Sequence, residues 1–329
     1  MAARKKLTLQ KARSLINTLC DIAHGTSELV ALGDARRNSV LRRAITDHDN
    51  RALYSWLMNT FSYQGISDQA VASFIAKHGN VQLEDVQDVL PNSSSCGKLE
   101  GFWTFNDCGY QKVSRTCSCQ SKLDGCALPA LPLRNGRLNQ TAYSLRFFIR
   151  DVASNDLVRF LDRLIDDIPS LASPREVHSI LVSPWRGIFG VSDKVVSMAL
   201  ATLLLSAPTT KTRWRTVGGT LIAVDTLVHN FLHRTGLSEF FGRTHIYGPH
   251  CYGRDGCFDV LGEVTKLVDA RRFRINFPSY FPRFVQLAVW RYCSTSFSNI
   301  CNSTQIDDSR RCRSQDCYMR SDCERIQLE

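Results

Sequence analysis

One carboxylate, Asp225, stands inside an otherwise apolar run, LIAVDTLVHNFLHRTG, at residues 221–236. An aspartate directly before an amphipathic helix is a normal N-cap, because its carboxylate accepts hydrogen bonds from free backbone N–H groups. The apolar residues that follow have the spacing of one helix face: Leu227, Val228, Phe231 and Leu232. The run therefore predicts a helix that begins just after Asp225, and it leaves open whether the carboxylate does more than cap that helix.

A short turn, GIFGVSDK, occupies residues 187–194 and precedes the apolar segment VVSMALATLLL. Small residues such as Gly187, Gly190 and Ser192 let backbone N–H groups at the start of a helix approach a phosphate closely, and the helix dipole favours that anion. The turn is therefore a candidate phosphate-binding hairpin between two helices. On the residues alone, Lys194 is a further phosphate contact or a solvated lysine after a turn.

The chain holds 13 cysteines, and most of them are clustered. Five lie within residues 293–323, and five lie in an irregular insert, namely Cys96, Cys108, Cys117, Cys119 and Cys126. Clustered cysteines in a reducing compartment favour metal or iron–sulfur ligation, whereas a secreted protein would favour disulfides. The basic N-terminus leads into no apolar export signal, so we expect a reducing compartment and cysteines that bind a metal or an iron–sulfur cluster. The insert cysteines could hold a second zinc or iron–sulfur site, since no CxxC pair decides between them.

Three segments, in the same order along the chain, resemble motifs of the endonuclease III-like (helix-hairpin-helix, HhH-GPD) DNA glycosylases. The turn at residues 188–194 is similar to their LPGVGxK hairpin, and VDTLV at 224–228, followed by HRTG, is similar to their VDTHV motif. The segment FSYQGISDQAV at 61–71 resembles the family's LSxQ helix start. The resemblance covers residues 46–90 and 140–240 and implies an all-α, two-lobed fold.

The same resemblance implies a reaction on double-stranded DNA, in which the modified nucleotide is extruded into a pocket. Asp225 would stabilise the positive charge that develops on the sugar as the N-glycosidic bond breaks. Lys194, once neutral, would attack C1′ and form a Schiff base that permits strand cleavage, which is AP-lyase activity. The DNA contacts would come from a side chain that enters the base stack and from the hairpin: Gln64, Gly187, Gly190 and Ser192.

We therefore expect a DNA glycosylase with lyase activity that removes a damaged or modified base. The alternatives are a monofunctional glycosylase, in which Lys194 only supports the hairpin, and a non-catalytic DNA-binding metal-cluster protein on the same fold. Three positions differ from the family's pattern, namely Phe189, Ser192 and Val196, and Asp193 puts an acid beside the expected phosphate site. An apparent insertion, TTKTRWRTVGG, also separates Lys194 from Asp225, as in the archaeal 8-oxoguanine branch of the superfamily. These differences concern the substrate base, which the sequence does not identify.

Members of the family often carry four cysteines near the C-terminus that hold a 4Fe–4S cluster, and cysteine-only ligation suits that cluster. The corresponding residues here would be Cys301, Cys312, Cys317 and Cys323; their last spacing agrees with the family and the earlier two are longer. Zinc is the alternative, because four thiolates also suit it. Cys293 lies on a predicted helix, VQLAVWRYC, and we expect it to be a core thiol.

The loop HIYGPHCYGRDGC, at residues 245–257, comes shortly after the predicted Asp225 helix. Its Tyr247, His250 and Tyr252 could line the base pocket by stacking and hydrogen bonding. An ordinary turn-rich loop is the alternative interpretation of this segment.

The composition is that of an ordinary globular chain, with 43% hydrophobic and 22% charged residues. A formal net charge of +10 suits a polyanionic partner such as nucleic acid. No apolar run is long enough for a membrane helix. We expect a monomer in the cytoplasm, associated with the nucleoid in a bacterium or nuclear in a eukaryote, and without membrane contact.

Most of the chain shows apolar residues at three- and four-residue spacing, which predicts an all-α protein. We expect N-terminal helices over residues 1–45 that pack with the C-terminal lobe. A helical lobe over 46–205 should end in the hairpin and carry the Cys-rich insert, 91–136. The C-terminal lobe, 206–329, should hold the Asp225 helix and the cysteine segment, 293–323, which would bind the metal or iron–sulfur cluster.

Overall fold

The computed structural model describes residues 7–25, 39–63, 68–87, 110–111, 116–117 and 136–328. Within these ranges the protein is helical, apart from one antiparallel pair of two-residue strands, β1 (Tyr110–Gln111) and β2 (Thr116–Cys117). The predicted all-α class is thereby confirmed. None of the described helices combines the length and the apolar character that crossing a membrane requires.

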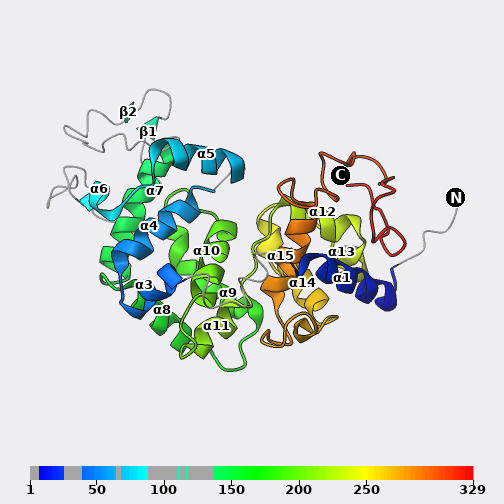
Figure 1. The fold of residues 1–329 in the computed structure, drawn as a ribbon, viewed down its shortest axis with the longest axis horizontal. Coiled ribbons are helices and arrows are strands. Elements are labelled where there is room, and N and C mark those ends of the chain that lie inside the picture. The colour runs from blue at the N-terminus through cyan, green and yellow to red at the C-terminus, as the bar shows by residue number, and fades with distance from the viewer. Residues whose placement is uncertain are drawn as a thin grey trace.

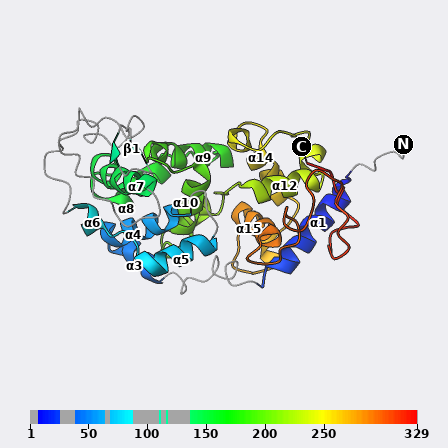
Figure 2. The same cartoon turned by 90° about the horizontal axis from the view of Figure 1, so that it is seen from above.

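The helices form two lobes that lie side by side, as Figure 1 shows, and the view from above separates the same two groups (Figure 2). The first lobe holds α3 (Ser39–Thr46), α4 (Asn50–Phe61), α5 (Asp68–His78), α6 (Leu83–Gln87), α7 (Gly136–Phe147), the π-helical η4 (Phe148–Val152), α8 (Leu157–Asp166), α9 (Pro174–Val182), the 3-10 helix η5 (Ser183–Gly187), α10 (Asp193–Leu205) and α11 (Thr212–Gly218). The second holds α1 (Leu9–Ala23), α12 (Thr226–Arg234), α13 (Leu237–Phe240), η6 (Pro249–Tyr252), α14 (Cys257–Thr265), η7 (Ala270–Arg272) and α15 (Pro282–Cys293).

Each lobe has its own hydrophobic core. The first core runs from Leu41 to Leu221, and the second combines residues 7–23 with a stretch that begins at Ile222. The chain therefore passes from one lobe to the other between Leu221 and Ile222, in the extended segment that leads to Asp225. The N-terminal helix α1 joins the second lobe by packing against α15.

The division between the cores differs from the sequence-based boundaries in two places. The segment after residue 205 was assigned to the C-terminal lobe, but α11 packs on α10 so closely that a Cβ on Gly218 would lie 2.7 Å from Leu204 Cβ. The helix α3 was grouped with the N-terminal helices, but its Leu41 and Ile45 are buried in the first core. Both differences arise because the apolar faces of these short helices find their partners within the first lobe.

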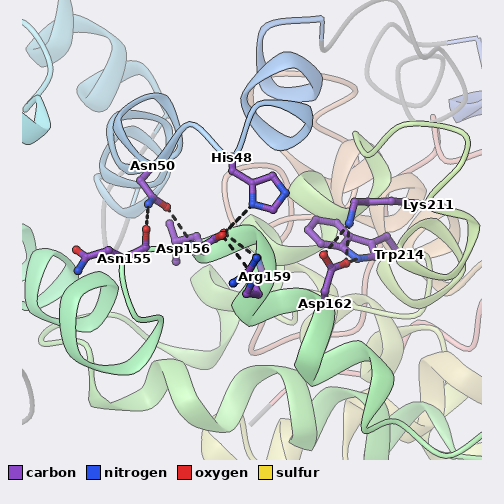
Figure 3. Close-up of polar contacts among 9 residues, drawn as sticks. His48, Asn50, Asn155, Asp156, Arg159, Asp162, Lys211 and Trp214 are labelled. Carbon is purple, nitrogen blue, oxygen red and sulfur yellow. Dashed lines mark hydrogen bonds and ion pairs between the residues drawn. The ribbon is translucent and has the colours of Figure 1, made fainter.

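Two polar contacts fasten α8 to its neighbours (Figure 3). The carboxylate of Asp156 caps α8 and lies 2.9 Å from Nδ1 of His48, which precedes α4. Further along α8, Asp162 accepts hydrogen bonds from Nζ of Lys211, at 2.6 Å, and from the indole N–H of Trp214, at 2.7 Å. The segment that looked like an insertion thus becomes part of the first lobe's framework.

Two helices and a turn occupy residues 174–205, where the sequence predicted a hairpin. The helix α9 begins with a capping box, in which the Ser173 hydroxyl accepts from the Glu176 N–H and the Glu176 carboxylate accepts from the Ser173 N–H. Pro174 suits the first helical position because its missing N–H would have no helical partner. After η5 and the turn, α10 begins at Asp193 and directs its N-terminus toward the second lobe's Asp225.

Candidate active site and metal centre

Lys194 and Asp225, the two residues that the sequence predicts to be catalytic, lie close together between the lobes. Nζ of Lys194 lies 3.6 Å from Oδ2 of Asp225. The lysine side chain is 37% exposed and the carboxylate 13%, so the pair is partly withdrawn from water and still reachable from outside. Lys194 lies in the first turn of α10, and Asp225 is the N-cap of α12. The positive ends of two helix dipoles therefore converge on the pair.

The carboxylate of Asp225 is held by its own helix. Its backbone is extended, and its Oδ1 accepts a hydrogen bond from the Val228 N–H at 3.0 Å. The preceding residue is also fixed, because the Val224 N–H donates to the Tyr252 hydroxyl at 2.7 Å. The cap interaction uses one oxygen and leaves the other facing Lys194. Capping and chemistry are therefore compatible roles for this residue.

A cavity of about 870 Å³ adjoins the pair. The first lobe contributes Tyr63, Arg186, Ser192, Asp193 and Lys194 to its wall, and the second contributes the short segments 224–226 and 247–249 together with Tyr252 and Gly253. Tyr247 and Tyr252, two of the three predicted pocket residues, thus line this cavity. The third, His250, is exposed and is not among the lining residues.

The hairpin turn is braced from outside by α7. The Phe189 N–H donates to the Ser144 hydroxyl at 3.0 Å, and its carbonyl accepts from the Thr141 hydroxyl at 2.8 Å. Gly190 has a φ of +75°, in the left-handed region that favours glycine. Of the predicted hairpin residues, Ser192 occupies the N-cap position of α10 and lines the cavity, while Gly187 ends η5 and Gly190 shapes the turn.

Asp193, the acid beside the expected phosphate site, has a cationic partner. Arg186 pairs with it at 2.6 Å, and the guanidinium Nε also donates to the carboxylate at 2.9 Å. Because this contact offsets the carboxylate charge, an acid at the start of α10 does not by itself repel a phosphate. Arg186 also lines the cavity.

The C-terminal cysteines belong to or pack against the core of the second lobe, but among the described residues their sulfurs do not form a group of converging ligand atoms. Burial, together with the neighbouring thiols of Cys301, Cys317 and Cys312, raises the pKa of Cys323 to about 12. All four are free thiols, and Cys301 and Cys312 are buried. Nη1 of Arg234 donates to Sγ of Cys301 at 3.6 Å, and the Tyr292 hydroxyl lies 3.3 Å from Sγ of Cys317. Cys293 is buried in the core beside Cys301.

A second group of donors was not recognised in the sequence. The ligand atoms of His229, His233, His245 and Cys257 lie within 4.8 Å of one another. Sγ of Cys251 lies 3.6 Å from Nδ1 of His229 and joins the same group. This cluster of histidine and cysteine side chains could bind a metal ion. Its signal in the sequence was two histidines at i and i+4, followed by the histidine and two cysteines of the 245–257 loop.

The protonation of these groups suits ligation. Burial, and then the neighbouring His229 and His245, lower the pKa of His233 to about 4, so its ring is neutral at pH 7. The hydrogen bond from the Cys257 thiol lowers the pKa of Cys251, where contacts with His229 and His245 act in the same direction, and it raises the pKa of Cys257. A neutral imidazole and the Cys251 thiolate are forms that bind metal, whereas Cys257 would release its proton on binding.

Several predicted residues lie outside the described part of the chain: Gln64, Cys96, Cys108, Cys119 and Cys126. Cys117 falls in β2, but its side chain is not described. Comparison of the chain with family models, with curated proteins and with solved structures finds no match. What the protein does must therefore be inferred from the residues of the site itself.

Proposed function

We propose that this protein is a helix-hairpin-helix DNA glycosylase that removes a modified or damaged base from duplex DNA. The observation that carries the proposal is the 3.6 Å approach of Lys194 to Asp225 at the wall of the cavity between the lobes. The cavity, of about 870 Å³, lies within the range of roughly 300–1,000 Å³ usual for ligand sites. It would receive the nucleotide after extrusion from the duplex, because a base inside the stack is out of reach.

Asp225 would provide the electrostatic stabilisation. When the N-glycosidic bond breaks, its electrons leave with the base and positive charge develops at C1′ of the sugar. The Oδ2 atom of Asp225 supplies negative charge at the cavity wall, and the bond from the Val228 N–H to Oδ1 keeps the carboxylate from turning away. A carboxylate fixed before the reaction stabilises the developing charge without a cost of reorganisation.

Lys194 would provide the nucleophile. Nζ must first lose a proton, which passes to water because the side chain is 37% exposed, so that Asp225, 3.6 Å away, keeps its charge. The neutral amine then forms a bond to C1′ as the base departs. The C1′–O4′ bond next breaks, O4′ takes up a proton from the attached amine, and the Schiff base so formed permits β-elimination of the 3′ phosphate. The ion pair also favours the protonated lysine, and this keeps a monofunctional glycosylase, in which water attacks C1′, as the second candidate.

The hairpin would anchor the DNA backbone. Residues 190–194 present backbone N–H groups at the start of α10, whose dipole attracts a phosphate. Arg186 offsets the charge of Asp193 there. The net charge of +10 favours the same partner, since phosphate neutralisation provides much of the affinity of proteins for DNA.

Cys301, Cys312, Cys317 and Cys323 would hold a 4Fe–4S cluster, with zinc as the alternative ion. The donor type fits, because all four are free thiols that belong to or pack against one core, and the buried Arg234 donates to Cys301, as groups near the sulfurs of such clusters do. When bound, the cluster would cross-link the C-terminal segment, residues 301–323, which contains no helix in the described structure. Arg234 and Tyr292 would orient the sulfurs from α12 and α15.

The test is incubation of the purified protein with a panel of duplexes, each carrying one modified base, scored for abasic sites and for strand breaks. We expect at least one duplex to lose its base, and an undamaged duplex to remain intact. Binding of duplex DNA without release of any base would instead support the non-catalytic DNA-binding protein. Absence of both binding and excision would contradict the proposal entirely.

A further inference from the structure

The histidine and cysteine donors behind the Asp225 helix come from four separate elements. His229 and His233 lie one turn apart on α12, and His245 lies in the loop after α13. Cys251 belongs to η6, and Cys257 is the first residue of α14. This group is distinct from the C-terminal cysteines. Side chains from elements so far apart in the sequence converge here within one small volume.

The spacing of the donor atoms matches the edges of a tetrahedron around a single ion. Zinc binds sulfur at about 2.3 Å and nitrogen at about 2.0–2.1 Å, so neighbouring ligand atoms in a tetrahedral site lie about 3.3–3.8 Å apart. Sγ of Cys257 lies 3.3 Å from Nδ1 of His229 and 3.3 Å from Nε2 of His245. Sγ of Cys251 lies 3.6 Å from Nδ1 of His229.

We propose that His229, His245, Cys251 and Cys257 bind a zinc ion. Cys251 takes the fourth position because its sulfur lies 3.6 Å from Nδ1 of His229 and adds a second thiolate, whereas the ligand atom of His233 lies within 4.8 Å of those of the other three donors. Two thiolates and two imidazoles form a standard closed set for structural zinc. His233 stacks on His229, with ring centroids 4.1 Å apart, and its buried Nε2 has no hydrogen-bond partner among the described residues. It therefore lies beside the four proposed ligands.

The ion would fasten the 245–257 loop to α12. The loop contains only one short 3-10 helix, and its Ile246 and Tyr247 are exposed, so packing alone holds it weakly. Gly256 lets the chain fold back tightly before Cys257, because a Cβ there would overlap the carbonyl of His250. The same loop supplies Tyr247 and Tyr252 to the wall of the cavity. The zinc site therefore positions one wall of the cavity from behind.

A link from α9 completes this fixation. Arg175 pairs with Asp259 on α14 and donates to the carbonyl of Gly253 at 2.9 Å. The Tyr252 ring stacks on His178 of α9, with centroids 5.2 Å apart. Zinc on one side and α9 on the other thus hold the segment that carries Tyr252. The inference does not depend on the proposed glycosylase activity, because zinc content and loop order are measured without any substrate.

The experiment is metal analysis of the full-length protein and of single variants. The parent should contain one tightly bound zinc per chain at this site, and Cys251→Ser and Cys257→Ser should each lose it. Cys20→Ser is the matched control, because Cys20 is a buried thiol on α1 that is not among these donors, and its zinc should be unchanged. His233→Asn should also keep the ion. Any zinc at the C-terminal cysteines is subtracted by repeating the analysis on a Cys317→Ser background.

Two further measurements keep the test valid if a cysteine variant fails to fold. Cobalt substituted into the parent should give the intense visible bands of tetrahedral Co(II) and the near-ultraviolet charge transfer of thiolate ligands. Removal of the metal from the parent with a chelator should increase amide hydrogen exchange in residues 244–256 and leave α10 unchanged. Parent protein without zinc, an octahedral cobalt spectrum, or Cys251→Ser and Cys257→Ser variants with full zinc would each overturn the site. Loss of zinc in His233→Asn but not in Cys251→Ser would overturn the ligand set.

Discussion

Lys194 and Asp225 approach to 3.6 Å although their helices belong to the cores of different lobes. The lysine lies at the start of α10, which packs in the first core, and the aspartate begins α12, which packs in the second. The distance between them is therefore set by how the lobes pack together. The pair is partly withdrawn from water and remains reachable from outside.

Substitution of Lys194 by Gln should separate two activities. Without the amine, no Schiff base can form at C1′, so borohydride trapping on an abasic duplex should be lost. Base excision with Asp225 intact should continue by attack of water, at a lower rate. Lys266→Gln is the matched control, because Lys266 is an exposed lysine that also pairs with a carboxylate, that of Glu263, at 2.9 Å. Trapping that survives in Lys194→Gln would assign the nucleophile to another residue.

The turn at Gly190 should be required for DNA binding. A side chain at a φ of +75° costs about 1–2 kcal/mol in the left-handed region, and a β-branched residue costs most. Gly190→Val should therefore distort the turn and weaken duplex binding, while the far-ultraviolet circular dichroism stays helical. Gly190→Asn is the control, since asparagine tolerates this conformation. Affinity of the parent should fall steeply as salt is added. Equal affinities of the three proteins, together with insensitivity to salt, would refute the hairpin assignment.

The parts of the site that could be predicted from the sequence depend on interactions between residues close together in the chain. A carboxylate before an amphipathic pattern predicts a capped helix, and α12 begins with Asp225 as its cap. Small residues between two apolar segments predict a tight turn, and Gly190 occupies the left-handed region there. The all-α class follows in the same way from helical periodicity. In each case the interacting groups lie within a few residues of one another.

What the sequence did not predict depends on contacts between distant residues. His229 and His233 look like the polar face of an amphipathic helix until the 245–257 loop folds back onto them. His250 appeared equivalent to Tyr247 and Tyr252, but the turn of η6 leaves it outside the cavity wall. The lobe boundary likewise depends on which core receives α11, and short apolar segments do not specify their partners.

Acid should destabilise the protein through His178. This ring is buried, and its Nε2 lies 3.0 Å from the Ser197 hydroxyl. Burial lowers its pKa from 6.5 to about 4. The charged groups that act on it are Asp193, which opposes the shift, and Arg186 and Arg175, which add to it. The unfolded chain therefore takes up a proton near pH 6.5, whereas the folded chain resists protonation until about pH 4.

The contribution of neutral, buried His178 to the free energy of unfolding is fully present at pH 7, and it is lost as the pH falls from about 6.5 toward 4. At 1.36 kcal/mol per pKa unit, the free energy of unfolding should fall by about 2 kcal/mol between pH 7 and pH 5 because of this residue. Urea unfolding of the parent and of His178→Gln at both pH values measures the effect. The parent should lose more stability than the variant. An equal loss in both would show that other groups cause the acid sensitivity.

A 4Fe–4S cluster at the C-terminal cysteines should give the protein a colour. Protein purified without oxygen should be brown, with broad absorbance in the visible range, and should contain iron and sulfide. Cys317→Ser should bleach the colour, whereas Cys20→Ser should keep it. Colourless parent protein with an additional zinc ion, removed by Cys317→Ser, would replace the cluster by a zinc site.

The role of Asp225 is tested by a change that preserves its shape. Asparagine caps a helix about as well as aspartate, so Asp225→Asn should keep the bond from the Val228 N–H and change the thermal midpoint little. The substitution removes the charge on the oxygen that faces Lys194, so base excision should fall by about 100-fold or more.

Asp49→Asn is the matched control, because Asp49 caps α4 in the first lobe with the same kind of bond, which the Ala52 N–H donates at 3.0 Å. Its excision rate should equal that of the parent. Single-turnover excision on a duplex that the parent cleaves, measured alongside thermal unfolding, separates the two roles. If Asp225→Asn excises as fast as the parent, the carboxylate is a helix cap alone, and the proposed chemistry is wrong.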